Sequence, residues 1–399
     1  MEQRGSNPIP SKARLLGLDI LRLLAVVLVM GRHMPSPPES WPAVARLPLL
    51  TWIQGGWVGV DLFFVLSGFL VSGLLFAEYK SRGKLEVSRF YMRRAWKIYP
   101  PFFTLIVATI ALQMLCGHPI PLSSLASECF FLQSYVPSLW NHTWSLAVEE
   151  HFYVLLPLVL ALILRWNRDS PTPMRPVLTV AAVVAVASLA LRVLNWYMRP
   201  LYHHLTHHFA SHLRLDSMLF GVAISYAYHF HRDTFAWRFT LWRRTLFVGG
   251  GMLLAPAFVL RLESTPSIYT VGLSAFYFGS GMMLVGVLLS QLPLRRSVAL
   301  LAALGAYSYS IYLWHMPILV WGVPLVERVL GVQLEFGAVV AVYFGGSFCL
   351  GIVMAKLVEV PALRLRDRWF PSHSPCAVGT GPNQTLQKPT AACSLSEID

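Results

Sequence analysis

Ionisable side chains interrupt several long apolar stretches of this 399-residue chain. Such side chains are costly in a bilayer and usually face a cavity or one another. In the stretch 15–34, Arg22 and His33 stand eleven residues apart, which puts them on one helix face with about 16 Å between them along the axis. His33 could act as a general base at neutral pH. The plainer roles stay open: Arg22 reaching back to the membrane interface, and His33 as an interfacial histidine.

Carboxylates occur at a depth similar to that expected for His33. Asp61 opens the apolar stretch 57–77, and Glu149 and Glu150 open the stretch 144–165. In a catalytic triad an acid orients the histidine, so we expect Glu149 or Asp61 to orient His33, with Glu150 in the same catalytic group. Asp61 could equally be a charge that favours a helix N-terminus.

Glycines in the stretch 57–77 point to packing rather than to chemistry. Gly59, Gly68 and Gly73 lie along it, and small residues let transmembrane helices approach closely. We expect other helices to contact this one at these positions.

A basic cluster precedes the apolar stretch 98–116. Arg93, Arg94 and Lys97 lie within five residues, and Arg94 and Lys97 share a helix face. Guanidinium and ammonium groups suit phosphate oxygens, so together with Arg22 they could hold a phosphorylated ligand. Basic residues that only fix the topology would look the same.

Five further residues are candidates for binding a second substrate near the outer side. Trp144 and Ser145 precede Glu149, Arg214 and Asp216 open another apolar stretch, and His315 ends a later one. A buried Arg214–Asp216 pair that bridges helices is the structural alternative.

The elements that position these residues are expected to be membrane helices. Of all residues, 55% are hydrophobic and 13% charged, whereas soluble domains carry about a quarter charged residues. Each apolar stretch approaches the roughly 20 residues needed to span a bilayer. The stretches are 15–34, 57–77, 98–116, 144–165, 177–197, 212–230, 245–260, 268–291, 298–321 and 336–358. The sequence predicts an all-α, polytopic membrane bundle of about ten transmembrane helices.

The basic residues predict the orientation of this bundle. With the N-terminus inside, the inner segments hold 24 Lys and Arg residues and the outer segments hold 6, as the positive-inside rule requires. Both termini are then cytoplasmic, in a multi-pass protein of the cell inner (plasma) membrane. The formal charge of +13 is thereby explained without a nucleic-acid partner.

One membrane domain is expected to occupy most of the chain. Residues 1–14 form a cytoplasmic segment, 15–368 the transmembrane domain, and 369–399 a polar cytoplasmic tail whose composition indicates disorder. No second folded domain is expected. The five cysteines lack metal-ligand spacing, and we expect no metal and no permanently bound cofactor.

Motifs spread over the chain resemble the membrane acyltransferase 3 family, whose members move acyl groups from cytoplasmic acyl-coenzyme A to hydroxyls, mostly on sugars. Their order and spacing over 15–368 make the resemblance specific. The motifs are Arg22-x10-His33, GVDLFFVLSGFL at 59–70, FYxRRxxKIxP at 90–100, WSLxxEExFY at 144–153, RLDSMLFG at 214–221, YSYSIYLWH at 307–315 and Glu359-x-Pro361.

The resemblance implies a ten-helix core, a catalytic role for His33, and coenzyme A binding by Arg22 and the basic residues before the third helix. Three positions depart from the family pattern. Lys97 stands where Arg is usual, Arg32 precedes His33 where a small or apolar residue is usual, and no glycine follows Asp19. Some members also carry a soluble esterase-like domain, which we do not expect here.

We therefore expect an O-acyltransferase that moves an acetyl or other short acyl group from acyl-coenzyme A, its co-substrate, to a hydroxyl of a glycan or sugar-bearing acceptor. His33 would be the base or would carry the acyl group itself. Two other classes remain as alternatives. A transporter of a glycan or small molecule would show inverted repeats, which the sequence does not display. A haem protein would use His33 and His315, which are expected at similar depth.

Overall fold

Helices make up all the regular secondary structure of the described residues, which are 11–290, 292–293 and 295–371 of this computed structural model. The all-α prediction is confirmed for this part of the chain. The expected segments 1–14 and 369–399 lie mostly outside the described residues.

Ten helices follow the expected apolar stretches. They are α1 (Ser11–His33), α3 (Gly59–Arg82), α4 (Val87–Leu115), α6 (Trp144–Trp166), α7 (Pro176–Met198), α9 (Leu215–Phe230), α11 (Arg243–Leu254), α13 (Leu273–Leu288), α15 (Ser308–Pro317) and α17 (Phe336–Met354). Shorter helices connect or extend them. These are α2 (Ala43–Gly55), α5 (Leu122–Cys129), α8 (His204–His207), α10 (Arg232–Phe239), α12 (Pro256–Val259), α14 (Arg296–Ala306), α16 (Val323–Leu330) and α18 (Val360–Trp369).

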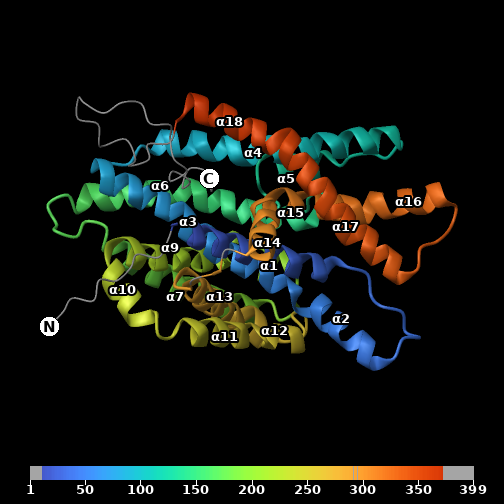
Figure 1. Ribbon diagram of the computed structural model, residues 1–399, viewed down its shortest axis with the longest axis horizontal. Coiled ribbons are helices and arrows are strands. Elements are labelled where there is room, and N and C mark those ends of the chain that lie inside the picture. The colour runs from blue at the N-terminus through green and yellow to red at the C-terminus, as the bar shows by residue number, and fades with distance from the viewer. Residues whose placement is uncertain (1–10, 291, 294, 372–399) are drawn as a thin grey trace.

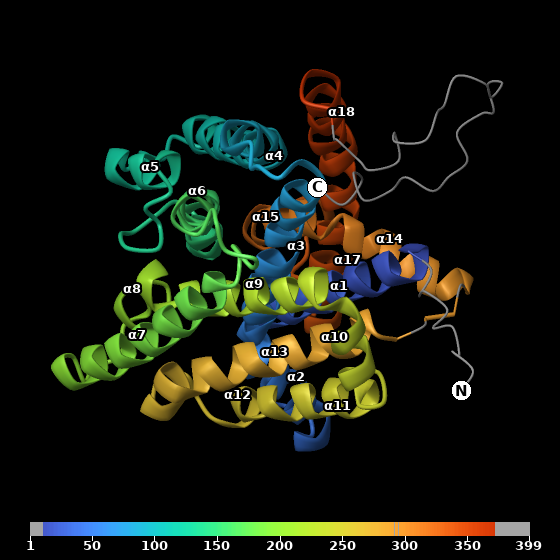
Figure 2. The same ribbon diagram turned by 90° about the vertical axis from the view of Figure 1, so that its left-hand side faces the viewer.

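Most of the long helices run along the longest axis of the molecule (Figure 1). The connections 83–86 and 167–175 and helix α10 lie at the left-hand end, whereas α2 and the connection from α16 to α17 lie at the right-hand end. Seen from the left-hand end, α3 and α15 lie inside the bundle and the other helices surround them (Figure 2). The segments expected inside the cell thus gather at one end.

Within the described residues, seven helical runs are long and apolar enough to cross a membrane. They are Ala43–Arg82, Val87–Leu115, Asn141–Trp166, Pro176–Met198, Ile268–Leu288, Ser308–Leu330 and Phe336–Trp369. Helices α1, α9 and α11 are not among them, so the count of ten and the side of each terminus stay predictions. The prediction of one continuous span over 298–321 is wrong. The stretch 298–321 divides into α14 and a separate run, Ser308–Leu330, which continues through Pro317 by way of the wide turn Ile318–Gly322.

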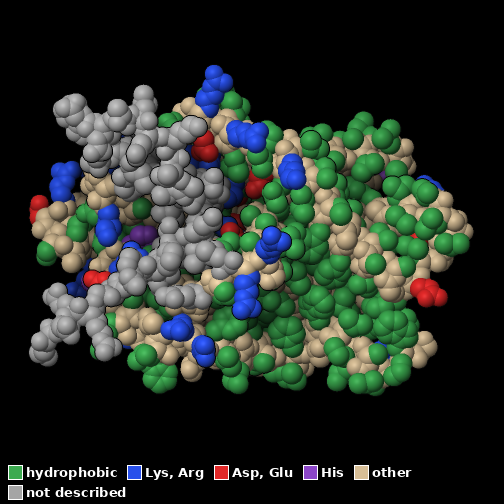
Figure 3. Space-filling model, viewed as in Figure 1, with side chains coloured by type: hydrophobic (Ala, Val, Ile, Leu, Met, Phe, Trp, Pro, Cys, Tyr) green, Lys and Arg blue, Asp and Glu red, His purple; other side chains and the backbone are tan. Residues whose placement is uncertain are grey.

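The surface carries the same asymmetry as the sequence. On the face shown in Figure 3, Lys and Arg side chains stand mainly over the left and middle parts, and hydrophobic side chains cover a broad area over the middle and right. Exposed apolar side chains include Val107, Leu115 and Val183 on α4 and α7. Such an extended apolar surface suits contact with lipid.

Glycines set the closest helix contacts, as expected. A Cβ on Gly68 of α3 would lie 2.0 Å from the carbonyl oxygen of Met218, and one on Gly221 of α9 would lie 2.2 Å from that of Val65. The two helices therefore touch backbone to backbone at reciprocal positions. Gly59 meets α1 in the same way, 2.4 Å from the Ala25 carbonyl oxygen, while Gly73 faces the ring of His229.

Two buried ion pairs join the start of α9 to its neighbours. Arg214 contacts Asp61 of α3 at 2.8 Å, and Asp216 contacts Arg192 of α7 at 2.8 Å, with all four side chains inaccessible to solvent. Inside a bundle such pairs are stable only when both partners are present. They hold α3, α7 and α9 together.

Candidate active site

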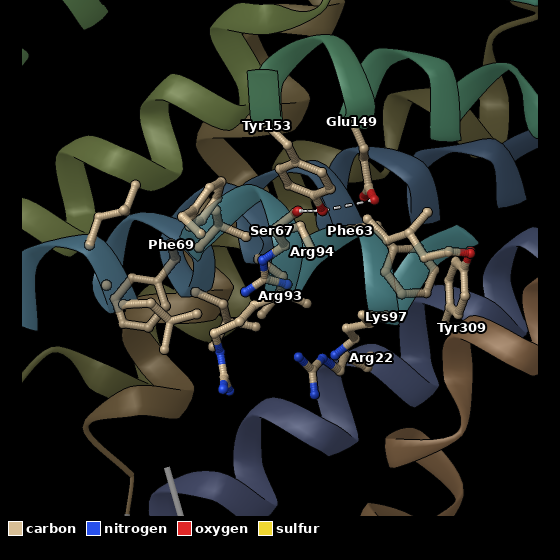
Figure 4. A pocket seen from close by; sticks show the side chains of 18 of the residues that line it. Arg22, Phe63, Ser67, Phe69, Arg93, Arg94, Lys97, Glu149, Tyr153 and Tyr309 are labelled. Atoms are coloured by element: carbon tan, nitrogen blue, oxygen red, sulfur yellow. Dashed lines mark hydrogen bonds between the residues drawn. The ribbon is translucent and has the colours of Figure 1, made fainter. Parts of the chain in front are cut away.

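A cavity of about 350 Å³ is lined by residues from the end of α3 and the start of α4, among them Glu78, Ser81 and Arg89. Four expected ligand-binding cations line it, and their nitrogen atoms converge on one space in Figure 4: Arg22 from α1 and Arg93, Arg94 and Lys97 from α4. Helix α4 can supply three of them because positions i, i+1 and i+4 span one side of a helix.

Another part of the cavity lining belongs to α3 and is mostly apolar. Its lining residues extend from Val60 to Ser81, about 30 Å along the helix axis. Phe63, Leu66 and Phe69 are among them. A cavity lined both by cations and by hydrocarbon suits a ligand that has a phosphorylated end and a long, less polar arm.

The three adjacent ionisable residues of α6 separate into three environments. Glu149 lines the cavity and accepts a hydrogen bond from the Tyr153 hydroxyl at 3.0 Å. Glu150 accepts one from Tyr99 at 3.2 Å, and His151 bonds Ser211 at 2.7 Å. Successive residues on a helix point about 100° apart. Glu150 is therefore buried between α6 and α4 rather than in the catalytic group where we expected it.

Carboxylates also balance the cations of the cavity. Asp19 pairs with Arg22 at 2.9 Å, and Asp367 of α18 pairs with Arg93 at 3.2 Å. Glu359, in the wide turn Ala355–Glu359, lines the cavity and accepts a hydrogen bond from Ser310 at 2.6 Å. These contacts fix the cations in place before any ligand arrives.

The cavity reaches Ser145 and Tyr312, whose hydroxyls are 2.6 Å apart. Tyr312 donates to the carbonyl oxygen of His142 at 2.5 Å. Its ring centroid is 5.6 Å from that of His142 and 5.5 Å from that of His315. Tyr312 thus stands between the cavity and a group of histidines farther along the bundle.

Three histidines from three parts of the chain form this group. The ring centroids of His33 and His315 are 5.3 Å apart, and those of His315 and His142 are 5.0 Å apart. His142 is 2% exposed and His315 is 0% exposed, while His33 is partly exposed. Among them, His33 is the one that is not fully buried. We call His33, His142 and His315 the histidine cluster.

The expected contact between His33 and a carboxylate does not occur among the described residues. Asp61 is engaged by Arg214, and Glu149 by Tyr153. Arg32, beside His33, turns to Glu263, which it contacts at 3.0 Å. The sequence gave no sign of which helix faces Asp61.

The other candidates for the second substrate surround these ion pairs. The Arg214 guanidinium lies 5.4 Å from the ring centroid of Phe64 and 5.9 Å from that of Trp144, which stacks on Phe209 at 4.3 Å. Arg214 and Asp216 are inaccessible to solvent. Arg214 and Asp216 therefore form buried ion pairs that bridge helices, which was the alternative to substrate binding. They do not pair with each other, however: each pairs with a residue of another helix.

His142 is held by a buried carboxylate that our sequence analysis missed. Glu128 of α5 accepts hydrogen bonds from the Trp140 amide and the Thr143 hydroxyl, both at 3.0 Å. These two residues flank the short turn that carries His142. Burial raises the pKa of Glu128 from its ordinary value of 4.5 to about 7, although both hydrogen bonds act in the opposite direction.

Other site residues, not predicted from the sequence, stand in or directly beside the motifs, where no role was assigned to them. His142 directly precedes the TWSL sequence, Tyr312 lies within YSYSIYLWH, and Glu359 opens the last motif. Arg192 was counted only as a charge outside the membrane. Its partner Asp216 is 24 positions later, and no local pattern connects the two.

Comparison with known proteins agrees with the motifs. The model of a family described as an acyltransferase domain matches residues 15–369. The chain is 27% identical over 337 residues to the peptidoglycan O-acetyltransferase OatA of Listeria monocytogenes, covering 78% of this chain and 50% of the relative. It is 26% identical over 331 residues to the O-acetyltransferase OatA of Staphylococcus aureus, covering 76% and 50%.

A third relative is the putative peptidoglycan O-acetyltransferase YrhL of Bacillus subtilis, 27% identical over 344 residues, with 78% of this chain and 49% of the relative covered. The chain spans about half the length of these curated relatives. No solved structure matches it. Because the family model covers nearly all the described residues, including the cation-lined cavity and the histidine cluster, this chain belongs to the membrane acyltransferase 3 family.

Proposed function

We propose that this protein is a multi-pass inner-membrane O-acyltransferase that moves an acetyl or other short acyl group from cytoplasmic acyl-coenzyme A to a hydroxyl of a glycan. The main support for the proposal is that the cation-lined cavity adjoins the histidine cluster. The cavity gathers Arg22, Arg93, Arg94 and Lys97. At Tyr312 it meets the histidine cluster.

The cavity supports a donor of the coenzyme A type. The cations would bind its phosphates, and the apolar wall of α3 would take the arm that leads to the thioester. Lys97 contributes a point charge, while the arginines contribute planar forks that match phosphate oxygens. Three of the cations, Arg93, Arg94 and Lys97, belong to a segment that the charge asymmetry places inside the cell, which supports a cytoplasmic donor.

The chemistry would take place at His33. Its imidazole takes the proton of the acceptor hydroxyl, and the oxygen attacks the thioester carbonyl carbon. The new C–O bond forms, the C–S bond breaks, and His33 returns the proton to the departing thiolate. A positioned base typically contributes about 10²–10⁴-fold to such a step. The acceptor is proposed as a glycan because the relatives' names specify O-acetylation of peptidoglycan.

The proposal is tested by removing two cavity cations together. In purified protein in lipid nanodiscs, Arg94→Gln with Lys97→Gln should raise the KM for acetyl-coenzyme A at least tenfold and make donor binding less sensitive to salt. The measurement is thiol release at increasing donor concentrations in 50 and 300 mM salt, between which the square of the electrostatic screening length falls about sixfold.

A matched control removes two positive charges at the same end of the molecule. Lys84 and Arg244 are exposed and do not line the cavity, so Lys84→Gln with Arg244→Gln should leave the KM within about twofold of wild type. If both double variants bind the donor as wild type does, the cavity is not the donor site.

A further inference from the structure

Two members of the histidine cluster have the position of their ring proton fixed by the backbone. His315 Nδ1 lies 2.5 Å from the Tyr312 carbonyl oxygen, and His142 Nε2 lies 3.3 Å from the Leu313 carbonyl oxygen. A carbonyl oxygen only accepts hydrogen bonds, so each of these nitrogens must carry the hydrogen. In a neutral imidazole the other nitrogen is then an acceptor with a lone pair.

Both lone-pair nitrogens are buried without a hydrogen-bond partner among the described residues. They are His315 Nε2 and His142 Nδ1, in side chains that are 0% and 2% exposed. Buried polar atoms almost always have a partner, and an exception calls for an explanation. A hydrogen-bond partner for His315 Nε2 is close by, because the third imidazole, His33, lies beside His315.

The distance between His33 and His315 suits a hydrogen bond. Two imidazoles joined by an N–H···N bond of about 3 Å have ring centroids roughly 5 Å apart, and these centroids are 5.3 Å apart. The rings are tilted by 47°, so a modest rotation of the partly exposed His33 brings an N–H toward His315 Nε2. The carboxylates that could compete for this role, Asp61 and Glu149, are bonded to Arg214 and Tyr153.

We infer that His315 is the positioning residue of the catalytic base: its Nε2 accepts a hydrogen bond from one nitrogen of His33 and leaves the other free for the acceptor hydroxyl. This rests on the proposed function of His33. A neutral imidazole thus takes the place that a carboxylate has in a triad. The proton from the hydroxyl goes to His33 and then to the thiolate, and His315 itself gains none.

The backbone bond of His315 is what makes this arrangement directional. Because Nδ1 is committed to Tyr312, Nε2 cannot become a donor without breaking that bond. His33 can therefore form a hydrogen bond with His315 only in the orientation in which one of its own N–H groups points toward His315 Nε2. Tyr312 also contacts the donor cavity through Ser145, so the same residue fixes the His315 tautomer and closes the donor site.

Substitution of His315 tests the inference in the full-length protein in nanodiscs with acetyl-coenzyme A. His315→Phe keeps a ring but removes the acceptor atom, and should lower kcat about 10²–10⁴-fold with the KM for acetyl-coenzyme A within twofold of wild type. His315→Gln places an amide oxygen near the position of Nε2 and should restore kcat at least tenfold over His315→Phe. His118, an exposed residue between α4 and α5, gives the control His118→Gln, which should match wild type.

The outcomes separate this inference from the proposed function. If His33→Ala is inactive while His315→Phe turns over normally, His315 does not position the base and the inference alone fails. If His33→Ala stays active, both fail. Equal loss of kcat in folded His315→Phe and His315→Gln would also overturn the inference, because the acceptor atom would then not matter.

A measurement on the wild-type protein does not depend on whether variants fold. Solid-state ¹⁵N spectra of histidine-labelled protein should show His315 as the neutral form protonated at Nδ1, with an Nε2 resonance shifted by an accepted hydrogen bond. His33→Ala should remove that shift. A His315 resonance protonated at Nε2 would contradict the inference.

Discussion

Arg22 and His33 lie along one side of α1 but serve different spaces. Arg22 lines the donor cavity, whereas His33 packs against His315 in the histidine cluster. The helix therefore separates two groups by about 16 Å along its axis. One, Arg22, would hold the donor's phosphates, and the other, His33, would act on its thioester.

Substitutions at these two residues should have opposite kinetic effects. His33→Ala should lower kcat by about 10²–10⁴-fold while acetyl-coenzyme A still binds, because Arg94 and Lys97 remain. Arg22→Ala should chiefly raise the Kd for the donor. Isothermal titration and thiol-release kinetics on the two nanodisc-reconstituted variants measure the split. A folded His33→Ala protein that keeps most of its turnover would shift the chemistry elsewhere.

At the scale of residues, the sequence predicted the candidate side chains of the cavity well. It predicted poorly which of these side chains contact one another. The cations of the cavity share helix faces, and spacing along a helix is enough to group them. Asp61 and Arg214 are 153 positions apart, and their pairing depends on how α3 packs against α9. His142 was missed for a similar reason: its role depends on His315, which arrives from α15.

Helices α3 and α9 pack backbone against backbone. Because a Cβ on Gly68 would lie 2.0 Å from a backbone oxygen, the helices must move apart to accept it, at a cost of about 1–3 kcal/mol. Gly68→Ala should therefore lower the melting temperature of the protein in nanodiscs, followed by thiol-dye or tryptophan fluorescence.

Gly251 on α11 is the matched control, since a Cβ there would meet nothing within 4 Å. Gly251→Ala should melt at or slightly above the wild-type temperature, because alanine favours helices by up to about 1 kcal/mol. Equal melting temperatures for Gly68→Ala and wild type would mean that the α3–α9 contact is looser than described.

The α5–α6 connection should make stability depend on pH through Glu128. Its pKa is raised from 4.5 to about 7 in the folded protein, so between these values the folded state holds a proton that the unfolded state has lost. The contribution of Glu128 is thus fully present below pH 4.5 and falls as the pH rises through 7. Glu128→Gln should flatten the decline in melting temperature from pH 5 to pH 8.

A matched control for this experiment is Glu335, an exposed residue that directly precedes α17. Glu335→Gln should keep the wild-type slope. If Glu128→Gln has the wild-type slope as well, the Glu128 carboxyl is not protonated in the folded protein.

The helices themselves were largely predictable because long apolar stretches have few other structures in a bilayer. The failure at 298–321 has a physical reason. Proline usually interrupts a helix by removing one backbone donor, but at Pro317 the following wide turn absorbs the defect. The stretch, expected as one span, is interrupted at Tyr307, between α14 and α15.

For the molecule as a whole, the unequal distribution of Lys and Arg predicts the orientation. In a variant without native cysteines, single cysteines at Lys84 and Arg238 should be protected from a membrane-impermeant maleimide in intact cells. A cysteine at Pro119, between α4 and α5, should react. All three positions are exposed, so accessibility reports the side of the membrane. Labelling at Lys84 from outside would reverse the orientation.

The hydrogen-bonded hydroxyls of Ser145 and Tyr312, at the point where the donor cavity meets the histidine cluster, have a consequence for the energetics of the cell. A membrane enzyme that works from both sides risks short-circuiting the proton gradient. If acyl-coenzyme A enters from the cytoplasm and the acceptor from the other side, as proposed, we expect this contact to restrict the passage of water and ions between the two spaces, so that acyl transfer would not drain the membrane potential.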